Sequence, residues 1–513
     1  MTHWRLYITA FIGGLVTLAL ELAAARLLAP AFGTSELVWS AIIGLILLYL
    51  AAGYALGGRW ADRSPRPVTL YTILAAAGAA IAVIPLLARP ALNLATRGMT
   101  SWRLGWIAGP FIVVLLLFVA PVTLLACVSP FAIRLTVREV RDAGNVAGRI
   151  SALSTLGSFI GTFLPNLVLI PNIGTRRTFL LLALLAVATG LWGLWSARRS
   201  RFYALAWLLI VLIALLLAPT AGPIKPTPGL IHETESTYNF IQVVERDATR
   251  YLLLNEGQGI HSVAFLDDRL LTDGPWDYFL IAPYFNAAPH PPEAVDSLLV
   301  IGLAAGTTPD QYTRIYGPLP IAGVEIDPEI VAVGRRFFGM TQPNLDVHIT
   351  DGRYFLRQTG QSHARYDVVA VDAYRLPYIP WHLTTVEFFA EVQARLTEEG
   401  VVAINVGHTP GDWRLVAAMV ATMREVFPAV HVIDVPTSFN AIVVATVQPT
   451  TSEALLDNLP HLTDARLRFV AQSAHENLRE VPPSDLVFTD DRAPIEQITH
   501  DLAARYLLGR SPP

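Results

Sequence analysis

Long apolar runs dominate the first half of the sequence. Each run has about 20 residues, the length that an α-helix needs to cross the hydrocarbon core of a bilayer. The runs are approximately residues 6–28, 37–58, 68–88, 106–130, 150–170, 178–196 and 202–219. Soluble cores do not repeat runs of this length with arginine-rich breaks between them. The pattern therefore predicts a multi-span α-helical membrane domain with seven spans.

The composition of the whole chain agrees with this division. Hydrophobic residues make up 53% of the 513 residues, and charged residues make up only 15%. Charged side chains return at the density of a soluble protein after about residue 230, which predicts a second, soluble domain. The net charge of −4 gives no reason to expect nucleic acid as a partner. With Cys127 as its single cysteine and no Cys/His cluster, the sequence predicts no metal site.

Two features inside the apolar runs have alternative interpretations. Glu21 lies in the first run, where an ionised side chain is costly unless it is paired or hydrated. It is therefore either a functional group or half of an ion pair with a nearby arginine. Gly157 and Gly161 have the small-xxx-small spacing that allows two helices to approach closely, so we expect helix packing there.

The second half of the chain alternates between strand and helix patterns. DSLLVIG, IAGVEID, YDVVAVD and GVVAINVG read as buried strands, and helical stretches separate them. This alternation predicts a doubly wound parallel sheet. The predicted domains are a transmembrane domain (1–222), a Pro/Gly-rich linker (223–235), a small antiparallel β-domain (236–290), a Rossmann-like nucleotide-binding domain (291–450) and a C-terminal helical extension (451–513).

Glycines and acids follow the predicted strands in a regular order. Ligands of such sheets bind at the carboxyl ends of the strands. Gly302 and Gly306 follow the first strand, where we expect the backbone to pass close to a ligand, and Glu325 ends the second, where an acid suits the hydroxyls of a ribose. Asp351 and Asp372 follow later strands. Each signal alone is weak, but together they predict a nucleotide site.

At these residues the chain resembles the spermidine synthase family, the polyamine aminopropyltransferases. The motifs that carry the resemblance are GLAAGTT, GVEIDPEIV, DGRYFL and DVVAVDAY, within a region of about 236–450. The whole chain resembles the membrane-fused branch of that family, as do DAYRLPYIPWHLTTVEFF and the late TDDRAPIEQ. The resemblance implies a small β-domain followed by a Rossmann-like methyltransferase fold.

The resemblance also implies roles for single residues. Glu325 would bind the ribose of decarboxylated S-adenosylmethionine, and Asp351 would contact its adenine. Asp372 would orient and deprotonate an acceptor amine. The resemblance also implies that Gln258 in NEGQG and Tyr374 beside Asp372 bind the substrate.

The sequence departs from the family pattern at three places. Ala305 stands where soluble members carry an aspartate for the aminopropyl ammonium, and Asp277-Tyr278 replaces a His-Glu pair. Arg375 replaces a second acid beside Asp372, and its charge would repel a diamine. Arg375 would instead hold a carboxylate, face solvent, or pair with Asp351 or Glu387.

The expected function is a membrane-bound transferase that moves an aminopropyl group to a small-molecule amine. Two alternatives remain: methyl transfer from intact S-adenosylmethionine, and a non-catalytic ligand-binding or transport protein. The expected partners are the lipid bilayer and the amine, with a homodimer left open. The loops on the same side of the membrane as the N-terminus hold eleven basic residues, and the loops on the other side hold seven. This mildly favours a cytoplasmic N-terminus, which with seven spans would put the soluble half outside. Because adenosyl donors are cytoplasmic, we nevertheless expect the soluble half of this cell-membrane protein in the cytoplasm.

Overall fold

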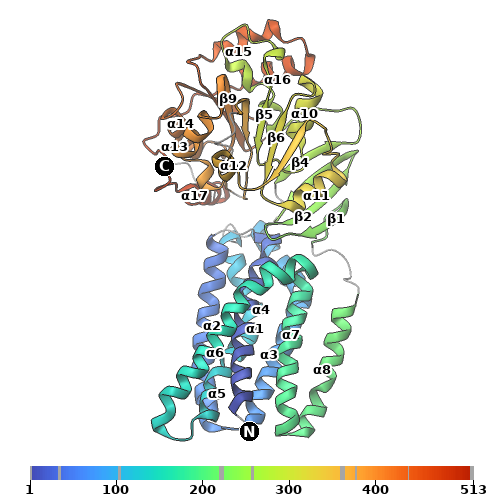
Figure 1. The fold of residues 1–513 in the computed structure, drawn as a ribbon, viewed down its shortest axis with the longest axis vertical. Helices are drawn as coiled ribbons and strands as arrows, with labels where there is room; N and C mark the ends of the chain where they lie inside the picture. The colour runs from blue at the N-terminus through green and yellow to red at the C-terminus, as the bar shows by residue number, and fades with distance from the viewer. Residues whose placement is uncertain are drawn as a thin grey trace. The chain divides into compact units, whose positions relative to one another are not determined.

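The computed structural model describes residues 3–32, 36–101, 105–218, 225–255, 259–358, 364–375, 378–436 and 438–508. These residues form two compact units, which are described separately (Figure 1). The helical unit takes the described residues of Met1–Thr227 together with Glu233–Phe240 and Asn255. The α/β unit takes Pro228–His232, Ile241–Leu254 and the described residues from 259 onward.

Long helices make up most of the helical unit. They are α1 (His3–Phe32), α2 (Glu36–Arg63), α3 (Pro67–Ser101), α4 (Gly105–Ala126), α5 (Val128–Thr136), α6 (Ala143–Leu164), α7 (Ile170–Ala197) and α8 (Arg199–Leu217). Among the described residues, six segments are long and apolar enough to cross a membrane. The helical, apolar character predicted for this half of the chain is therefore present.

The difference between six segments and the predicted seven spans lies in one place. The segment Val140–Ala197 is 58 residues long and holds both α6 and α7, which correspond to two of the predicted runs. A straight helix of that length would measure about 87 Å, far more than the roughly 30 Å of a bilayer core. It is not straight, because Gly174 has φ 78° and ψ 164°, outside the helical region.

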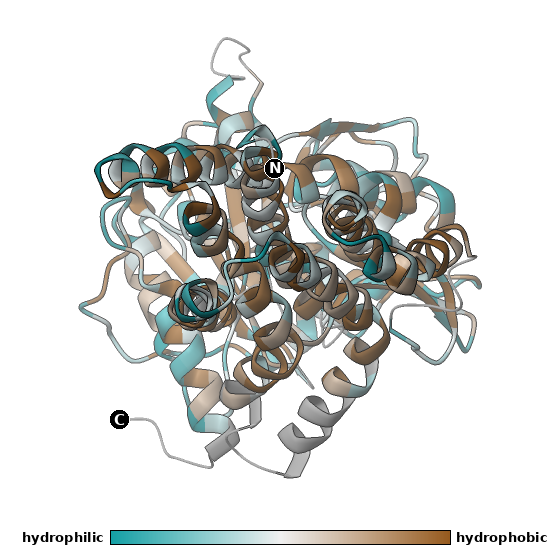
Figure 2. Cartoon of the chain, turned by 90° about the horizontal axis from the view of Figure 1, so that it is seen from below, coloured by the Kyte–Doolittle hydropathy of each residue, from teal (hydrophilic) through white to brown (hydrophobic). Residues whose placement is uncertain are grey.

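Large apolar side chains also cover the outside of the helical unit. Leu48 on α2 is 60% exposed, Phe159 on α6 is 63% exposed and Ile210 on α8 is 72% exposed. Figure 2 shows the same apolar character along the helices seen end-on. A water-soluble bundle would turn polar side chains outward, so this surface suits contact with lipid.

The glycines of α6 explain how closely α6 packs against α1. A Cβ atom added at Gly157 would lie 2.0 Å from the carbonyl oxygen of Phe11, and one at Gly161 would lie 2.2 Å from that of Leu15. Any larger residue at either position would push the two helices apart. The packing predicted from the small-xxx-small spacing is thus confirmed.

The surroundings of Glu21 test the alternative that it forms an ion pair with a nearby arginine. Its side chain is partly buried on α1, and within the described ranges no arginine forms an ion pair with it. Arg26, one turn further along α1, donates instead to the carbonyl oxygen of Thr237. The ion-pair interpretation is therefore wrong for the described part of the chain, and a functional role of Glu21 stays a prediction.

A small sheet precedes the main sheet in the chain. Its strands are β1 (Leu230–Glu235), β2 (Phe240–Arg246), β3 (Thr249–Leu254) and β4 (Ile260–Phe265), in that order, and β2–β3 and β3–β4 are antiparallel. Asp247 and Ala248, both with positive φ, make the two-residue turn between β2 and β3. This conformation matches the twist of a tight hairpin. The sheet begins earlier than predicted, because β1 falls in the segment expected to be linker.

The main sheet has seven strands in the order β10-β11-β9-β8-β5-β6-β7. They are β5 (Leu298–Ile301), β6 (Ile321–Glu325), β7 (Leu345–Ile349), β8 (Tyr366–Val371), β9 (Leu396–Gly407), β10 (Ala429–Asp434) and β11 (Asn440–Thr446). Strands β5 to β9 are parallel, and β11 runs antiparallel to both β9 and β10. The predicted doubly wound parallel sheet is confirmed for these strands.

Helices cover both faces of this sheet. Alternate β5 residues belong to different cores: Leu299 and Ile301 pack with α12 (Gly352–Gln358), α13 (Val386–Gln393), α14 (Arg414–Arg424) and α17 (Ile495–Leu508). Leu298 and Val300 pack with α9 (Pro275–Phe279), α10 (Thr307–Tyr316), α15 (Glu453–Asn458) and α16 (Ala465–Glu476). Helix α11 (Pro328–Phe337) packs on the small sheet. The strands are therefore buried on both faces, which explains their continuous apolar runs.

The packing of α6 predicts opposite effects for the same substitution at two of its glycines. Gly157→Ala should lower the thermal unfolding midpoint of the purified protein in detergent, because the new Cβ would collide with the backbone of α1. Gly148→Ala on the same helix should keep or raise the midpoint, since a Cβ there meets nothing within 4 Å and alanine favours helix by about 1 kcal/mol. Equal effects at both positions would contradict the close α1–α6 contact.

Candidate active site

The candidate site lies at the carboxyl ends of the central parallel strands. Ile301 of β5 is in register with Val324 of β6 and with Val371 of β8, and Val371 is in register with Ile404 of β9. The residues that follow these positions are Gly302, Glu325, Asp372 and Asn405. The register therefore gathers three of the predicted site residues at one edge and adds Asn405, which the sequence analysis did not select.

The turn after β5 is built around glycines with left-handed backbone conformations. Gly302 has φ +90°, and a Cβ atom there would lie 2.6 Å from the Cα atom of Ala373. Gly306 has φ +92°, and a Cβ there would lie 2.7 Å from the side chain of Met340. In this structure both glycines are required by their neighbours in the protein. Their predicted closeness to a ligand stays a prediction.

Glu325 ends β6 with its side chain only 7% exposed. Its carboxylate accepts hydrogen bonds from the backbone N–H groups of Ala304, at 2.9 Å, and Asp327, at 3.1 Å. Burial raises the pKa of the Glu325 carboxyl to about 7, although these two N–H donors oppose the rise. Each carboxylate oxygen retains a lone pair, so Glu325 can still accept from the hydroxyls of a ligand.

Asp351 is a different kind of carboxyl group. It is partly exposed, lies 2.8 Å from Nε2 of His382, and accepts from the backbone N–H of Tyr354 at 3.0 Å. The His382 contact holds the pKa of Asp351 below its ordinary value. Asp351 therefore stays ionised and fixed in place.

The late TDDRAPIEQ motif supports the helix that follows Asp351. Arg353 at the start of α12 is buried and pairs with Glu391 at 2.9 Å and with Asp490 of that motif at 2.6 Å. Asp490 also accepts from the hydroxyl of Thr385 at 2.7 Å. Breaking a buried ion pair leaves an uncompensated charge, so this cluster ties α12 to α13 and to the C-terminal segment.

Asp372 follows β8 and is the most distinctive group of the site. Asn405 donates from Nδ2 to its Oδ1 at 2.9 Å, and the side chain of Trp276 also forms a hydrogen bond with it. Burial raises the pKa of Asp372 to about 7, and the two hydrogen bonds oppose the rise. A carboxyl group with this pKa can take up or release a proton near neutral pH.

A chain of hydrogen bonds orients the amide that holds Asp372. Ser438 donates to Oδ1 of Asn440 at 2.6 Å, and Asn440 donates to Oδ1 of Asn405 at 2.8 Å. This leaves Nδ2 of Asn405 to face Asp372. The hydroxyl of Tyr374 donates to the backbone oxygen of Asn405 at 3.1 Å. Tyr374 thus lies beside this chain, and its predicted substrate contact stays a prediction.

Of the two remaining predicted substrate residues, the structure describes Arg375. Arg375 is exposed, and its backbone pairs with that of Tyr378. Among the described residues it forms no ion pair with Asp351 or Glu387, so the pairing interpretation is wrong, and the solvent-facing and carboxylate-holding interpretations both stay open. Gln258 lies outside the described residues.

Three contact residues of the site were missed in the sequence: Trp276, His382 and Asn405. A usable signal existed for Asn405, since it is the polar residue in the otherwise apolar strand stretch VVAINV. A buried amide needs partners, so it marks a polar cluster. Trp276 comes from the short helix α9 and His382 from a single 3-10 turn (Trp381–Leu383), and their sequence pattern does not indicate which strand end they would approach.

This sheet order, with antiparallel β11 between β9 and β10, defines a Rossmann-like, methyltransferase-type fold with its polar residues at the carboxyl edge. Comparison with known proteins gives a match of residues 296–458 to the spermine/spermidine synthase domain. A polyamine aminopropyltransferase of Vibrio vulnificus is 30% identical over 241 residues, which cover 44% of this chain and 75% of that protein. The chain therefore belongs to the spermine/spermidine synthase family and is a transferase.

Two further relatives show the range of the similarity. A probable polyamine aminopropyl transferase of Bifidobacterium longum is 28% identical over 319 residues, covering 59% of this chain and 69% of that protein. The eEF1A lysine and N-terminal methyltransferase of Bos taurus is 31% identical over 145 residues, covering 26% of this chain and 20% of that protein. Membership of an enzyme family favours the enzymatic interpretation over a non-catalytic binding protein.

The contact between Asn405 and Asp372 predicts a shift in the pH dependence of the reaction. The amide stabilises the ionised carboxylate, so Asn405→Ala should raise the pKa of Asp372 further above its present value of about 7. Loss of a charge-assisted hydrogen bond of about 1.5–3 kcal/mol corresponds to a rise of roughly 1–2 pH units. The acid limb of the rate profile should move upward by that amount, and the rate at pH 7 should fall.

Asn440→Ala is the matched control, because Asn440 contacts Asn405 and not Asp372. It should shift the acid limb less than Asn405→Ala does. An unmoved acid limb in Asn405→Ala, combined with a weaker apparent affinity for the donor, would mean that Asn405 only shapes the nucleotide pocket.

Proposed function

We propose that this protein transfers an aminopropyl group from decarboxylated S-adenosylmethionine to an amine, with Asp372 as the base. The observation that carries the proposal is the Asp372 carboxyl group, which has a pKa of about 7 and hydrogen bonds from Asn405 and Trp276. The described residues give it no cationic partner. A cationic ligand would supply the missing positive charge.

Other acids of the same edge suit the donor. Glu325 has acceptor capacity left for the two ribose hydroxyls, and those hydroxyls would lower its pKa from about 7 by hydrogen bonding to the ionised form. Asp351, fixed by His382, is placed after the next strand and would contact the adenine or its surroundings. These assignments follow the family pattern and the strand-end positions.

The proposed step is a direct displacement. An acceptor amine loses a proton to Asp372, and its nitrogen lone pair attacks the aminopropyl carbon next to the sulfonium. The carbon–sulfur bond breaks, its electron pair stays on sulfur, and the donor leaves as the neutral thioether 5′-methylthioadenosine. Because the sulfonium is already a good leaving group, proton removal and positioning provide the catalysis.

Methyl transfer from intact S-adenosylmethionine is the second candidate, and Arg375 and Ala305 favour it. Intact donor carries an additional carboxylate. The exposed guanidinium of Arg375, which has no ion-pair partner within the described ranges, could bind it. Ala305 is 2% exposed and provides no acid for the ammonium of the decarboxylated donor. The two candidates differ in their products, since methyl transfer leaves S-adenosylhomocysteine.

The proposed location is the cell membrane, with the α/β unit in the cytoplasm. The helical unit supplies six described segments that are long and apolar enough to span a bilayer. The donor is made in the cytoplasm, so a transferase that uses it must face that side. A small-molecule amine is the proposed acceptor.

Asp372→Asn tests the reaction. The purified full-length protein should convert decarboxylated S-adenosylmethionine and an amine to 5′-methylthioadenosine, and the variant should lose at least about 100-fold in rate while it binds the donor nearly unchanged. Glu325→Gln should have its main effect on donor binding, which it should weaken, and a smaller effect on the rate with saturating donor. Formation of S-adenosylhomocysteine from the intact donor would replace the aminopropyl proposal by methyl transfer, and equal losses of binding and rate in Asp372→Asn would make that residue structural.

Protease treatment tests the proposed side of the membrane. Protease added to intact cells should leave the chain beyond residue 230 whole, because the membrane shields it, and should cut it once the cells are opened. Digestion in intact cells would place the α/β unit outside, where the proposed donor is absent.

A further inference from the structure

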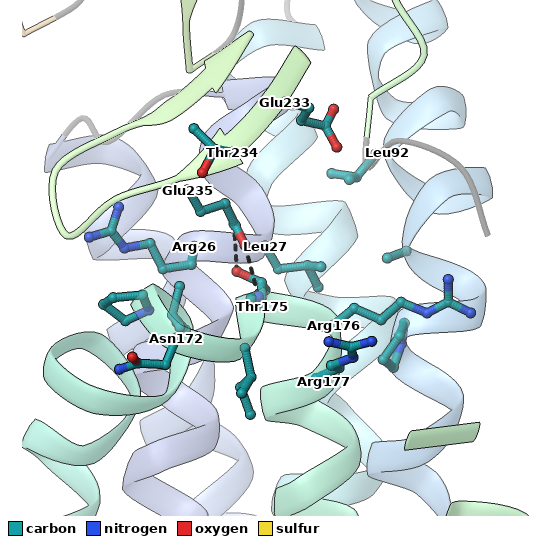
Figure 3. A pocket seen from close by; sticks show the side chains of 16 residues that line it. Arg26, Leu27, Leu92, Asn172, Thr175, Arg176, Arg177, Glu233, Thr234 and Glu235 are labelled. Atoms are coloured by element: carbon teal, nitrogen blue, oxygen red, sulfur yellow. Dashed lines mark hydrogen bonds between the residues drawn. The ribbon is translucent and has the colours of Figure 1, made fainter. Parts of the chain in front are cut away.

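A pocket of about 350 Å³ lies within the helical unit, and the residues of the candidate active site are not among those that line it. It is bordered by α1, α3, α7 and the segment Glu233–Glu235 (Figure 3). The charged side chains that line it are those of Arg26, Arg176, Arg177, Glu233 and Glu235. Neither the family assignment nor the proposed reaction gives this pocket a role.

The break in α7 at Gly174 shapes one wall of the pocket. The helix resumes at Thr175, whose backbone N–H donates to Oε2 of Glu235 at 2.8 Å and whose hydroxyl donates to Oε1 at 2.7 Å. Figure 3 shows these two bonds between the strand segment and α7. The Glu235 carboxylate is therefore held in place by α7 and forms a fixed part of the wall.

The arginines of the pocket exceed its acids. Arg26 donates to the carbonyl oxygen of Thr237 and lies near Glu235. In contrast, the described part of the chain offers neither Arg176 nor Arg177 an ion-pair partner. Nε of Arg177 is buried and finds no hydrogen-bond acceptor among the described residues. A buried guanidinium nitrogen without an acceptor is costly, so a ligand that supplies anionic oxygens would be stabilised here.

The other side of the pocket is apolar. Leu27, Pro85, Ala88 and Leu92 line it together with the arginines. Arg26 lies six residues before the end of α1 at Phe32, which is about 9 Å along the helix. In a bilayer that depth corresponds to the boundary between the acyl chains and the phosphate groups, where arginines extend toward the headgroups.

We propose that this pocket binds the phosphate of an anionic amphiphile, with Arg176 and Arg177 as the phosphate ligands and the Leu27–Leu92 side receiving the adjoining apolar part. A diamine is a poor fit, because the three arginines outnumber the two glutamates of the lining and Glu235 is already hydrogen-bonded to Thr175. An acidic phospholipid supplies this chemistry from the bilayer, and a soluble phosphate compound supplies it from water. The inference rests on the proposed membrane setting and not on the proposed reaction.

The test uses the purified full-length protein in detergent and two lipids with the same acyl chains. Dioleoylphosphatidylglycerol should raise the thermal unfolding midpoint at lower concentration than dioleoylphosphatidylcholine does, since binding to the folded state stabilises it. The double variant Arg176→Gln/Arg177→Gln should need about 25-fold more phosphatidylglycerol for the same shift, at a factor of about 5 for each arginine. Arg198→Gln/Arg199→Gln, which removes two adjacent arginines at the other end of α7, should behave as wild type.

Inorganic phosphate separates the two sources. If it has no effect up to millimolar concentration, the ligand is a lipid headgroup; if it shifts the midpoint and competes with phosphatidylglycerol, the ligand is a soluble phosphate compound. Equal responses to both lipids, or an equal loss in the Arg198/Arg199 control, would overturn the proposal.

A variant without a change of charge covers the case in which the double arginine variant does not fold. Leu92→Trp should reduce phosphatidylglycerol binding by filling the apolar side, and unchanged binding would overturn the proposal. Donor binding should be the same in all these variants. Its absence in the wild type would count against the proposed reaction and not against the pocket.

Discussion

The pairing of β5 with β8 is the constraint on which the rest of the α/β unit depends. The two strands run parallel with Ile301 opposite Val371, so the chain leaves both at the same edge. The departing segments then approach so closely that only a glycine fits at position 302, with the backbone of Ala373 2.6 Å from where a Cβ would stand. This contact fixes Asp372 beside the turn that precedes α10. A larger residue at 302 would displace the candidate base before it affected any ligand.

Desolvation divides the acids of this edge into two kinds. Glu325 and Asp372 have pKa values raised to about 7 by burial, whereas the pKa of Asp351 is held low by His382. The described residues place no cation beside Glu325 or Asp372. Burying carboxyl groups without a cation costs free energy, and such groups are typical of sites where a ligand offsets this cost. A sulfonium donor and an ammonium acceptor are both cations, so the free site is poised for ligands of that charge.

The sequence predicted the elements better than it predicted their neighbours. Apolar length identified the helices, and strand–helix alternation identified the sheet, because both patterns are local. Asp372 and Glu325 were found since each directly follows an apolar strand. Trp276 and His382 were missed because their approach to the acids depends on how distant segments pack. The break at Gly174 falls in the gap between the predicted runs 150–170 and 178–196, so the division of these runs agrees with it.

Ala305 shows why one departure from the family pattern cannot be read as a simple loss of charge. Its side chain belongs to the apolar cluster between α11 and the small sheet, with Ile241 and Ile330. Its backbone N–H donates to the hydroxyl of Ser262 on β4 at 2.9 Å, so the turn is tied to the small sheet. An aspartate at this position would have to leave that cluster or be buried in it without a partner. Exchange of Ala305 for aspartate would therefore change the packing of the small sheet against the turn as well as the charge.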